Sequence, residues 1–153
     1  MRIGALRKTA ALLALLAFAC VAREAPSNAQ TRTLPNPVLY FQTFEVFQSG
    51  GKEFIRYRYG VDNFAAYPDT MFTASPQLPP CGQNTKASRT WVDVYAQDGK
   101  RLYGFCAFGK ASDLNSVWFA LESSVIPPSW VYIELTDRST NTKYKSNLAE
   151  TTQ

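Results

Sequence analysis

The residue types that carry most enzyme chemistry are scarce in this chain. It contains no histidine, which excludes a Ser-His-Asp triad, a Cys-His pair and any histidine-bound metal site. It also lacks a glycine-rich phosphate loop and a dinucleotide-binding fingerprint. The sequence therefore predicts neither a metal site nor a cofactor, and any catalysis would depend on carboxylates, hydroxyls or lysines.

Two carboxylates, Asp93 and Glu134, lie in strand-like segments beside aromatic residues. A glycoside hydrolase uses such a pair, one as general acid and the other as base or nucleophile. An acidic residue on a solvent-facing strand, however, usually serves solubility alone, and a domain of about 110 residues rarely builds a glycosidase cleft. We therefore predict that the protein is not an enzyme, with a carboxylate-dependent glycoside hydrolase as an alternative.

Aromatic residues are the more distinctive side chains, since Phe, Trp and Tyr make up 14% of the chain. Several alternate with Val, Ile or Leu, so that one strand face would be core and the other would show rings interspersed with polar groups. Such a face is suited to binding a sugar or a peptide. In the alternative interpretation the rings pack against other strands or a proline-rich loop. The candidate ligand-binding residues are Trp91, Asp93, Tyr95, Tyr103, Trp130, Tyr132 and Glu134.

The N-terminus has the pattern of a secretory signal peptide. Three basic residues at positions 2, 7 and 8 precede an uncharged run over 9–22, which is too short to span a bilayer. Small residues predict cleavage after Ala29, so that residues 1–29 are the signal peptide. Cleavage after Ala19 is the alternative and would expose Cys20 for lipidation. The predicted location is extracytoplasmic: periplasmic, anchored to the outer membrane or secreted.

Two cysteines are left in the mature chain, Cys81 and Cys106. In an oxidising compartment such a pair usually forms a disulfide, and we predict one here; two separate buried thiols are the alternative. Their spacing is not the Cys-x-x-Cys of redox proteins. Two thiols without histidine also make a poor zinc site.

Removal of the signal peptide also removes most of the positive charge. The full chain carries 16 basic and 12 acidic residues, and loss of residues 1–29 leaves 12 basic and 11 acidic ones. A nearly neutral domain has no long-range field to attract nucleic acid or an acidic membrane surface. We therefore expect an unidentified protein or glycan partner, no nucleic acid, and membrane contact only through a lipid on Cys20.

The rest of the sequence predicts one all-β domain over residues 38–146, after a polar tether at 30–37 and before a polar tail at 147–153. Asp98-Gly99 between two β-rich runs is a strong hairpin signal. Residues 112–114 suggest a single helical turn. The predicted strands are 39–47, 53–61, 70–73, 89–95, 101–108, 117–121, 130–137 and 143–146.

Seven to eight short strands joined by turns predict a β-sandwich of immunoglobulin-like type, with a small β-barrel as the alternative. The function we expect is that of an exported binding or structural module, whose ligand would be a carbohydrate or a peptide held on the aromatic strand face. A second possibility is a small secreted inhibitor of a hydrolase, in which the 75–88 loop, fixed by Cys81, would be the inhibitory element.

Overall fold

The computed structural model describes residues 33–78, 81 and 86–151. The predicted signal peptide, both of its cleavage sites and Cys20 lie outside the described residues. So does most of the central part of the 75–88 loop that the inhibitor hypothesis invokes, at 79–80 and 82–85.

The described part of the chain is all-β, with eight strands and three short 3-10 helices. The helices are η1 (Phe64–Ala66), η2 (Asp69–Met71) and η3 (Ala111–Ser116). The strands are β1 (Leu39–Ser49), β2 (Lys52–Val61), β3 (Thr90–Ala96), β4 (Arg101–Phe105), β5 (Val117–Glu122), β6 (Trp130–Asp137), β7 (Thr142–Lys145) and β8 (Ala149–Glu150).

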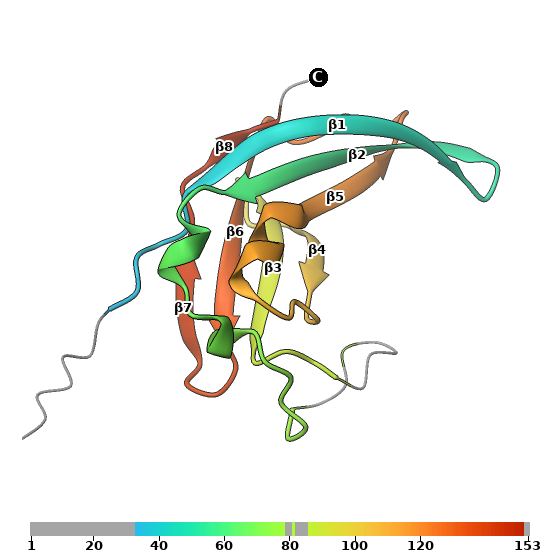
Figure 1. The fold of residues 1–153 in the computed structure, drawn as a ribbon. Coiled ribbons are helices and arrows are strands. Elements are labelled where there is room, and N and C mark those ends of the chain that lie inside the picture. Colours follow the sequence, from blue (N-terminus) through green and yellow to red (C-terminus); the bar gives the residue numbers. More distant parts are fainter. Residues whose placement is uncertain (1–32, 79–80, 82–85, 152–153) are drawn as a thin grey trace, which may run out of the picture. The chain divides into compact units, whose positions relative to one another are not determined.

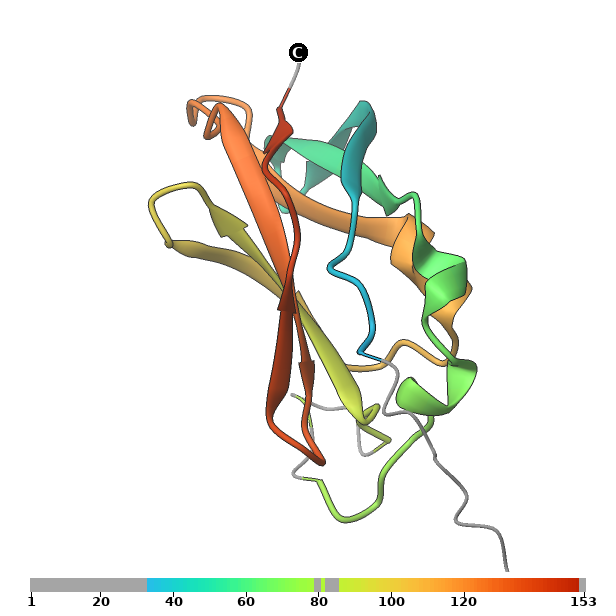
Figure 2. The same cartoon turned by 90° about the vertical axis from the view of Figure 1, so that its left-hand side faces the viewer.

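The strands form two antiparallel sheets in a sandwich-like arrangement, as predicted. One sheet has the order β1-β2-β5, and the other has the order β4-β3-β6-β7 with β8 paired to β6. The strands of the two sheets run crosswise in Figure 1, and Figure 2 gives the view at right angles. β4 and β5 are each the last strand of their own sheet, so each has one backbone edge without a neighbouring strand.

The core lies between the sheets and follows the alternation of the sequence. In β2, Tyr57, Tyr59 and Val61 are buried, while Arg56 and Arg58 lie on the other face. In β3, Val92 and Val94 are buried in the same way. Because successive side chains of a strand point to opposite faces, the period-two pattern correctly identifies the core side of these two strands.

The predicted hairpin is confirmed: β3 pairs antiparallel with β4 around the Asp98-Gly99 turn. Gly99 has φ +86°, a conformation that favours glycine. The Asp98 carboxylate accepts a hydrogen bond from the Lys100 backbone N–H at 2.9 Å. The predicted helical turn at 112–114 falls within η3.

The strand predicted at 70–73 is wrong, because this segment contains η2 and not a strand. Pro68 precedes η2 in an extended conformation, and the Phe72 backbone N–H bonds back to the Asp69 carbonyl at 2.9 Å. Met71 and Phe72 are buried in the core. The apolar residues of this segment resemble a strand in the sequence. In the folded protein, however, a tight turn brings them into the core.

The segments expected to be tether and tail are partly attached to the domain. Residues 34–37 have no regular structure, but Leu34 packs against the core and the Tyr67 hydroxyl donates to the Pro35 carbonyl at 2.6 Å. At the other end, the Asn147 side chain bonds both the N–H (2.7 Å) and the carbonyl (3.0 Å) of Leu39. This amide takes the place of a neighbouring strand beside β1, and β8 follows it.

Candidate functional site

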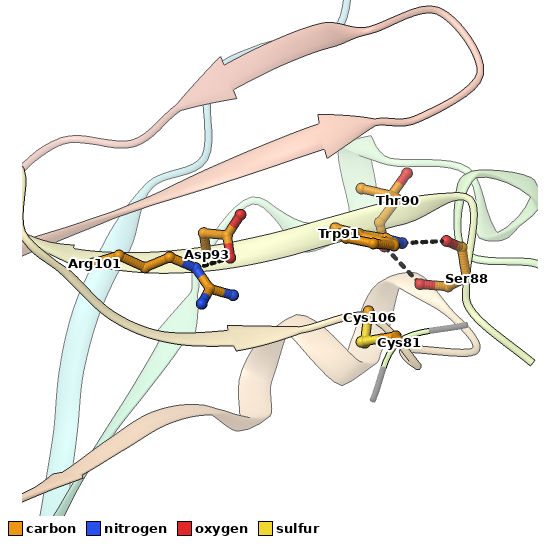
Figure 3. The surroundings of a disulfide bond; sticks show 7 residues. All are labelled: Cys81, Ser88, Thr90, Trp91, Asp93, Arg101 and Cys106. Carbon is orange, nitrogen blue, oxygen red and sulfur yellow. Dashed lines mark hydrogen bonds and ion pairs between the residues drawn. A yellow bond between two sulfur atoms is a disulfide. The ribbon is translucent and has the colours of Figure 1, made fainter. Parts of the chain in front are cut away.

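The site region is bordered by a disulfide between Cys81 and Cys106, whose Cα atoms are 6.0 Å apart. The prediction of this bridge agrees with the structure. Cys106 follows β4 directly, and its carbonyl accepts a hydrogen bond from the Ser88 N–H at 2.7 Å. Figure 3 shows the bridge beside the start of β3. A disulfide of this kind is typical of an oxidising environment.

The two candidate carboxylates face each other across neighbouring strands. Asp93 of β3 lies directly opposite Glu134 of β6 in the register. Each is paired with a cation: Asp93 with Arg101 at 2.7 Å and Glu134 with Lys143 at 2.7 Å. Figure 3 shows the Arg101 side chain reaching Asp93. The hydrogen bond from Glu134 raises the pKa of Lys143, as expected for an ammonium held by a carboxylate.

Gly104 is what allows the first of these ion pairs. It lies opposite Asp93 in the register, and a Cβ atom at this position would collide with the Arg101 guanidinium and the Asp93 carboxylate. Because Gly104 has no side chain, the Arg101 side chain can lie over it and reach Asp93 of β3.

Aromatic residues flank the two carboxylates on the same outer face. The rings of Tyr95 and Tyr132 stack with centroids 5.2 Å apart, and the Lys145 ammonium lies 4.0 Å from the Tyr132 centroid. The Arg138 guanidinium lies 4.6 Å from the Trp91 ring. Partial burial, with the charge of Asp93 nearby, raises the pKa of Tyr95. The face thus consists of rings covered by cations and of carboxylates that are already paired.

Of the seven predicted ligand-binding residues, six lie on this outer face, since Trp130 is two residues before Tyr132 in β6 and shares its side. Five of them, Trp91, Asp93, Tyr95, Tyr132 and Glu134, lie within the β3–β6 pairing and are called the β3–β6 face below. Trp130, 39% exposed, lies at the start of β6 opposite Glu150 of β8.

Tyr103 does not belong to the β3–β6 face, although the alternation of the sequence predicts it there. It lies opposite Val94, whereas Arg101 lies opposite Tyr95, so that Leu102 is an extra residue in β4. Such a β-bulge shifts the alternation by one residue. Side chains directly opposite in an antiparallel pair share a face, and Tyr103 is therefore on the side of the buried Val94.

The aromatic ring of Tyr103 joins a second cluster, which connects the two sheets. Its centroid lies 4.3 Å from Trp118 of β5 and 5.0 Å from Phe105. Phe105 in turn stacks on Phe108 at 5.0 Å. No backbone hydrogen bond joins β4 to β5, both of which the structure describes in full. The rings are therefore the main contact between these two strand edges.

On its other side, Trp118 contacts a cation held between two rings. The Arg56 guanidinium lies 4.8 Å from the Trp118 centroid and 4.7 Å from that of Phe47, which stacks on Phe54. Glu45 accepts from Arg56 at 2.6 Å and from Arg58 at 2.8 Å. The hydrogen bond from Arg58 is the largest effect on the pKa of Glu45 and lowers it. Desolvation acts in the opposite direction, and the charge of Arg58 and the hydrogen bond from Arg56 add to the lowering.

Two cavities adjoin Trp118, which lines both. The larger one, of about 580 Å³, runs along residues 103–108 and is closed by Cys81, Ser116 and Trp118. The smaller one, of about 280 Å³, is lined by Phe47, Ser49, Phe54, Arg56, Trp118 and Ala120. We call the two together the Trp118 groove. The larger cavity is within the size range of small-ligand sites, and neither cavity includes Asp93 or Glu134.

Sequence reasoning missed Phe47, Phe54, Arg56, Phe108 and Trp118 as site residues. A signal for Trp118 is present, because it alternates with Val117 and Phe119, both of which are buried. A tryptophan on the outward side of a short strand is a candidate for a surface contact. Its contact with Tyr103, however, could not be predicted locally, because it depends on β4 and β5, from different sheets, lying side by side.

Among residues 33–78, 81 and 86–151, no cluster of three His, Cys, Asp or Glu side chains is placed to hold a metal ion. The helices found in the same ranges are all too short or too polar to cross a membrane. Comparison with protein-family models, with curated proteins and with solved structures finds no match to this chain.

Proposed function

We propose that this chain is an exported, non-enzymatic binding module that holds its ligand in the Trp118 groove. The observation that carries the proposal is the pair of cavities that share Trp118 and have six aromatic side chains between them in their lining. Concave, mostly apolar surfaces with a few polar groups are the usual form of a binding site. Tyr103, 38% exposed, offers both a ring face and a hydroxyl to such a ligand.

Export is supported by two independent features. The N-terminal pattern of residues 1–29 is that of a secretory signal. The Cys81–Cys106 disulfide suits a compartment outside the cytoplasm. The Cys20 lipoprotein form stays an alternative within this proposal, and the intact mass of the mature protein distinguishes the two.

The strand order within the two sheets is compatible with the predicted immunoglobulin-like type, which we retain as part of the proposal. In that fold the first, second and fifth strands share one sheet, and the third, sixth and seventh share the other. The orders β1-β2-β5 and β3-β6-β7 follow this rule, and the fourth strand is placed next to the third. Sandwiches of this type commonly serve recognition, although fold alone does not imply function.

The β3–β6 face is the weaker candidate for ligand binding. Its cations already cover Trp91 and Tyr132, and its carboxylates are already paired. A ligand would have to displace these contacts. The direct opposition of Asp93 and Glu134 is the one feature that favours the alternative of a carboxylate-dependent glycoside hydrolase. An Asp93→Asn variant that retains full ligand binding but loses glycan cleavage would support that alternative.

The proposal is tested with two tyrosines of similar exposure in different places. The full chain, expressed with its own leader and purified in oxidised form, is screened against a glycan array and a phage-displayed library of random linear peptides. Tyr103→Ala should weaken the binding of selected ligands by about tenfold or more, or roughly 1.4 kcal/mol. Tyr40→Ala is the matched control. Tyr40 of β1 is 42% exposed but lines neither cavity of the groove.

Equal binding by the Tyr103→Ala and Tyr40→Ala variants would place the ligand outside the groove and contradict the proposal. The absence of any ligand in both libraries would count against a binding role. Circular dichroism of each variant verifies that the sheets are intact before the affinities are compared.

A further inference from the structure

Among the described strands, none pairs with the outer edge of β4, and this edge gives the Trp118 groove a specific ligand chemistry. We propose that the groove takes an extended peptide, which adds to β4 as a further strand and inserts alternate side chains between the aromatic rings. This inference rests on the proposed binding function and names its ligand class.

The backbone geometry supports the first part of the proposal. The larger cavity is lined by six consecutive residues, 103–108, so it follows the strand edge and its continuation. β4 is the last strand of its sheet, and none of the described strands pairs with its outer edge. Cys81 adjoins this edge at Cys106, through the disulfide. An edge strand presents a row of N–H and C=O groups that an extended peptide can pair with.

The positions of the rings support the second part. Tyr103 and Phe105 are two residues apart and lie opposite the buried Val94 and Val92 of β3, so they share one face of β4. Trp118 closes that face from β5, in contact with both rings. A strand added beside β4 would place every second side chain on the same face, against these rings.

The lining of the larger cavity also favours a peptide over a glycan. Among the described residues that line it, none carries a carboxylate, an amide or a cation, and the polar side-chain groups belong to Tyr103, Ser116 and Trp118. The many hydroxyls of a sugar need several fixed polar partners, because a buried group without one is costly. A peptide strand satisfies its own polar groups on the β4 backbone and needs only apolar walls.

Two of the other strand edges, those of β7 and β1, differ from the β4 edge in features that discourage strand addition. β7 carries Lys143 and Lys145, and β1 carries Glu45 and a register irregularity between Phe41 and Thr43. Charges and bulges are the usual protection of exposed edges. Residues 102–108, in contrast, contain no charged residue and no proline. Arg101, at the start of β4, is directed to Asp93 on the other face.

The experiment uses linear peptides selected from the phage library on the oxidised full chain. Each selected peptide is remade with single N-methyl groups along its backbone, which remove one N–H at a time and leave the protein unaltered. N-methylation at every second position should weaken binding by about tenfold or more, and the intervening positions should tolerate it, because only alternate N–H groups of an added strand face its neighbour. Amide hydrogen exchange should slow at residues 103–108 when the peptide binds.

Three results would overturn the inference. One is that peptides bind with an affinity that does not depend on which position is methylated. Binding would then come from side-chain contacts alone and not from backbone pairing. Another is that glycans bind through Tyr103 while no peptide does; the proposed binding function would then stand and the peptide assignment would fail. The third is that neither library yields a ligand, in which case both proposals fail.

Discussion

The Trp118 indole lies with its centroid 4.3 Å from that of Tyr103, and the two residues belong to different sheets. No hydrogen bond joins the backbones of β4 and β5, so this ring contact links the two strand edges at the groove. It therefore holds the two edges together, and under the binding function proposed above it would also contact the ligand.

We predict that Trp118 and Tyr103 are energetically coupled. In a double-mutant cycle with Trp118→Ala and Tyr103→Ala, the coupling free energy should be about 0.5–1.5 kcal/mol, as for other aromatic pairs. Urea denaturation of the four proteins measures it. A cycle between Tyr103→Ala and Trp91→Ala is the control and should be additive, since Trp91 lies on the opposite face of the same sheet. Additivity in the first cycle would show that the contact contributes nothing to stability.

The disulfide prediction concerns the free energy of unfolding. A Cys81→Ala/Cys106→Ala double variant should be destabilised by about 2–4 kcal/mol, because the bridge restricts the unfolded chain over a separation of 25 residues. Replacing both cysteines avoids a lone thiol. Non-reducing peptide mapping should find Cys81 linked to Cys106 in the wild type. Rapid alkylation of both thiols in native, oxidised protein would contradict the bridge.

Period-two alternation was enough to predict the positions of β1 to β7 and the core side of β2 and β3. Tyr57 and Tyr59 in β2, and Val92 and Val94 in β3, are buried as the pattern requires. The hairpin turn was predictable too, because Gly99 adopts the positive φ for which glycine is suited. These features depend on residues close in sequence, where local preference and hydrophobic pattern act together.

The groove could not be predicted in the same way. The side on which Tyr103 lies depends on the bulge at Leu102, and no residue type in that segment specifies a bulge. Its contact with Trp118 further depends on which strands end the two sheets, a long-range property of the topology. β8 was missed for the same reason. Asn147, just before β8, is held by two hydrogen bonds to Leu39, which is 108 residues away in the sequence.

A further prediction concerns the two arginines that share Glu45. Arg56 lies between two rings, whereas Arg58 is an ordinary partner of the carboxylate. The buried Nε of Arg56 has no hydrogen-bond partner among the described residues. This part of the guanidinium is instead in contact with the aromatic rings. Lysine keeps the charge but not the planar stacking. Arg56→Lys should therefore destabilise by about 1 kcal/mol.

Arg58→Lys is the matched control for this substitution, because it changes the same chemistry next to the same carboxylate. Its effect should be within about 0.5 kcal/mol of zero, as for a partly exposed ion pair. Thermal and urea denaturation measure both variants. Equal losses for the two would mean that the rings of Phe47 and Trp118 add nothing to the interaction with Arg56.

The last prediction is a loss of stability in acid caused by Asp137. Burial of this carboxyl group acts to raise its pKa, but hydrogen bonds from Arg89 (2.7 and 3.0 Å) and from the Ser139 hydroxyl and backbone outweigh that effect. The pKa of Asp137 in the folded protein is therefore far below the unfolded value of about 3.9. The unfolded state binds the proton first, so the stabilisation is complete above about pH 4 to 5 and is lost as the pH falls through and below that range.

Asp137→Asn should lower the free energy of unfolding by about 1–3 kcal/mol at neutral pH, less than for a fully buried pair, because the Arg89 side chain is 37% exposed. Between neutral pH and about pH 3, the wild type should lose more stability than the variant, since the variant has no proton to take up at this site. Asp93→Asn is the control: the side chain of its partner Arg101 is 58% exposed, so the pair contributes only about 0–1 kcal/mol. Urea titrations at several pH values measure all three proteins. Parallel losses in the wild type and Asp137→Asn would contradict the assignment, because the pH dependence would then come from other carboxylates.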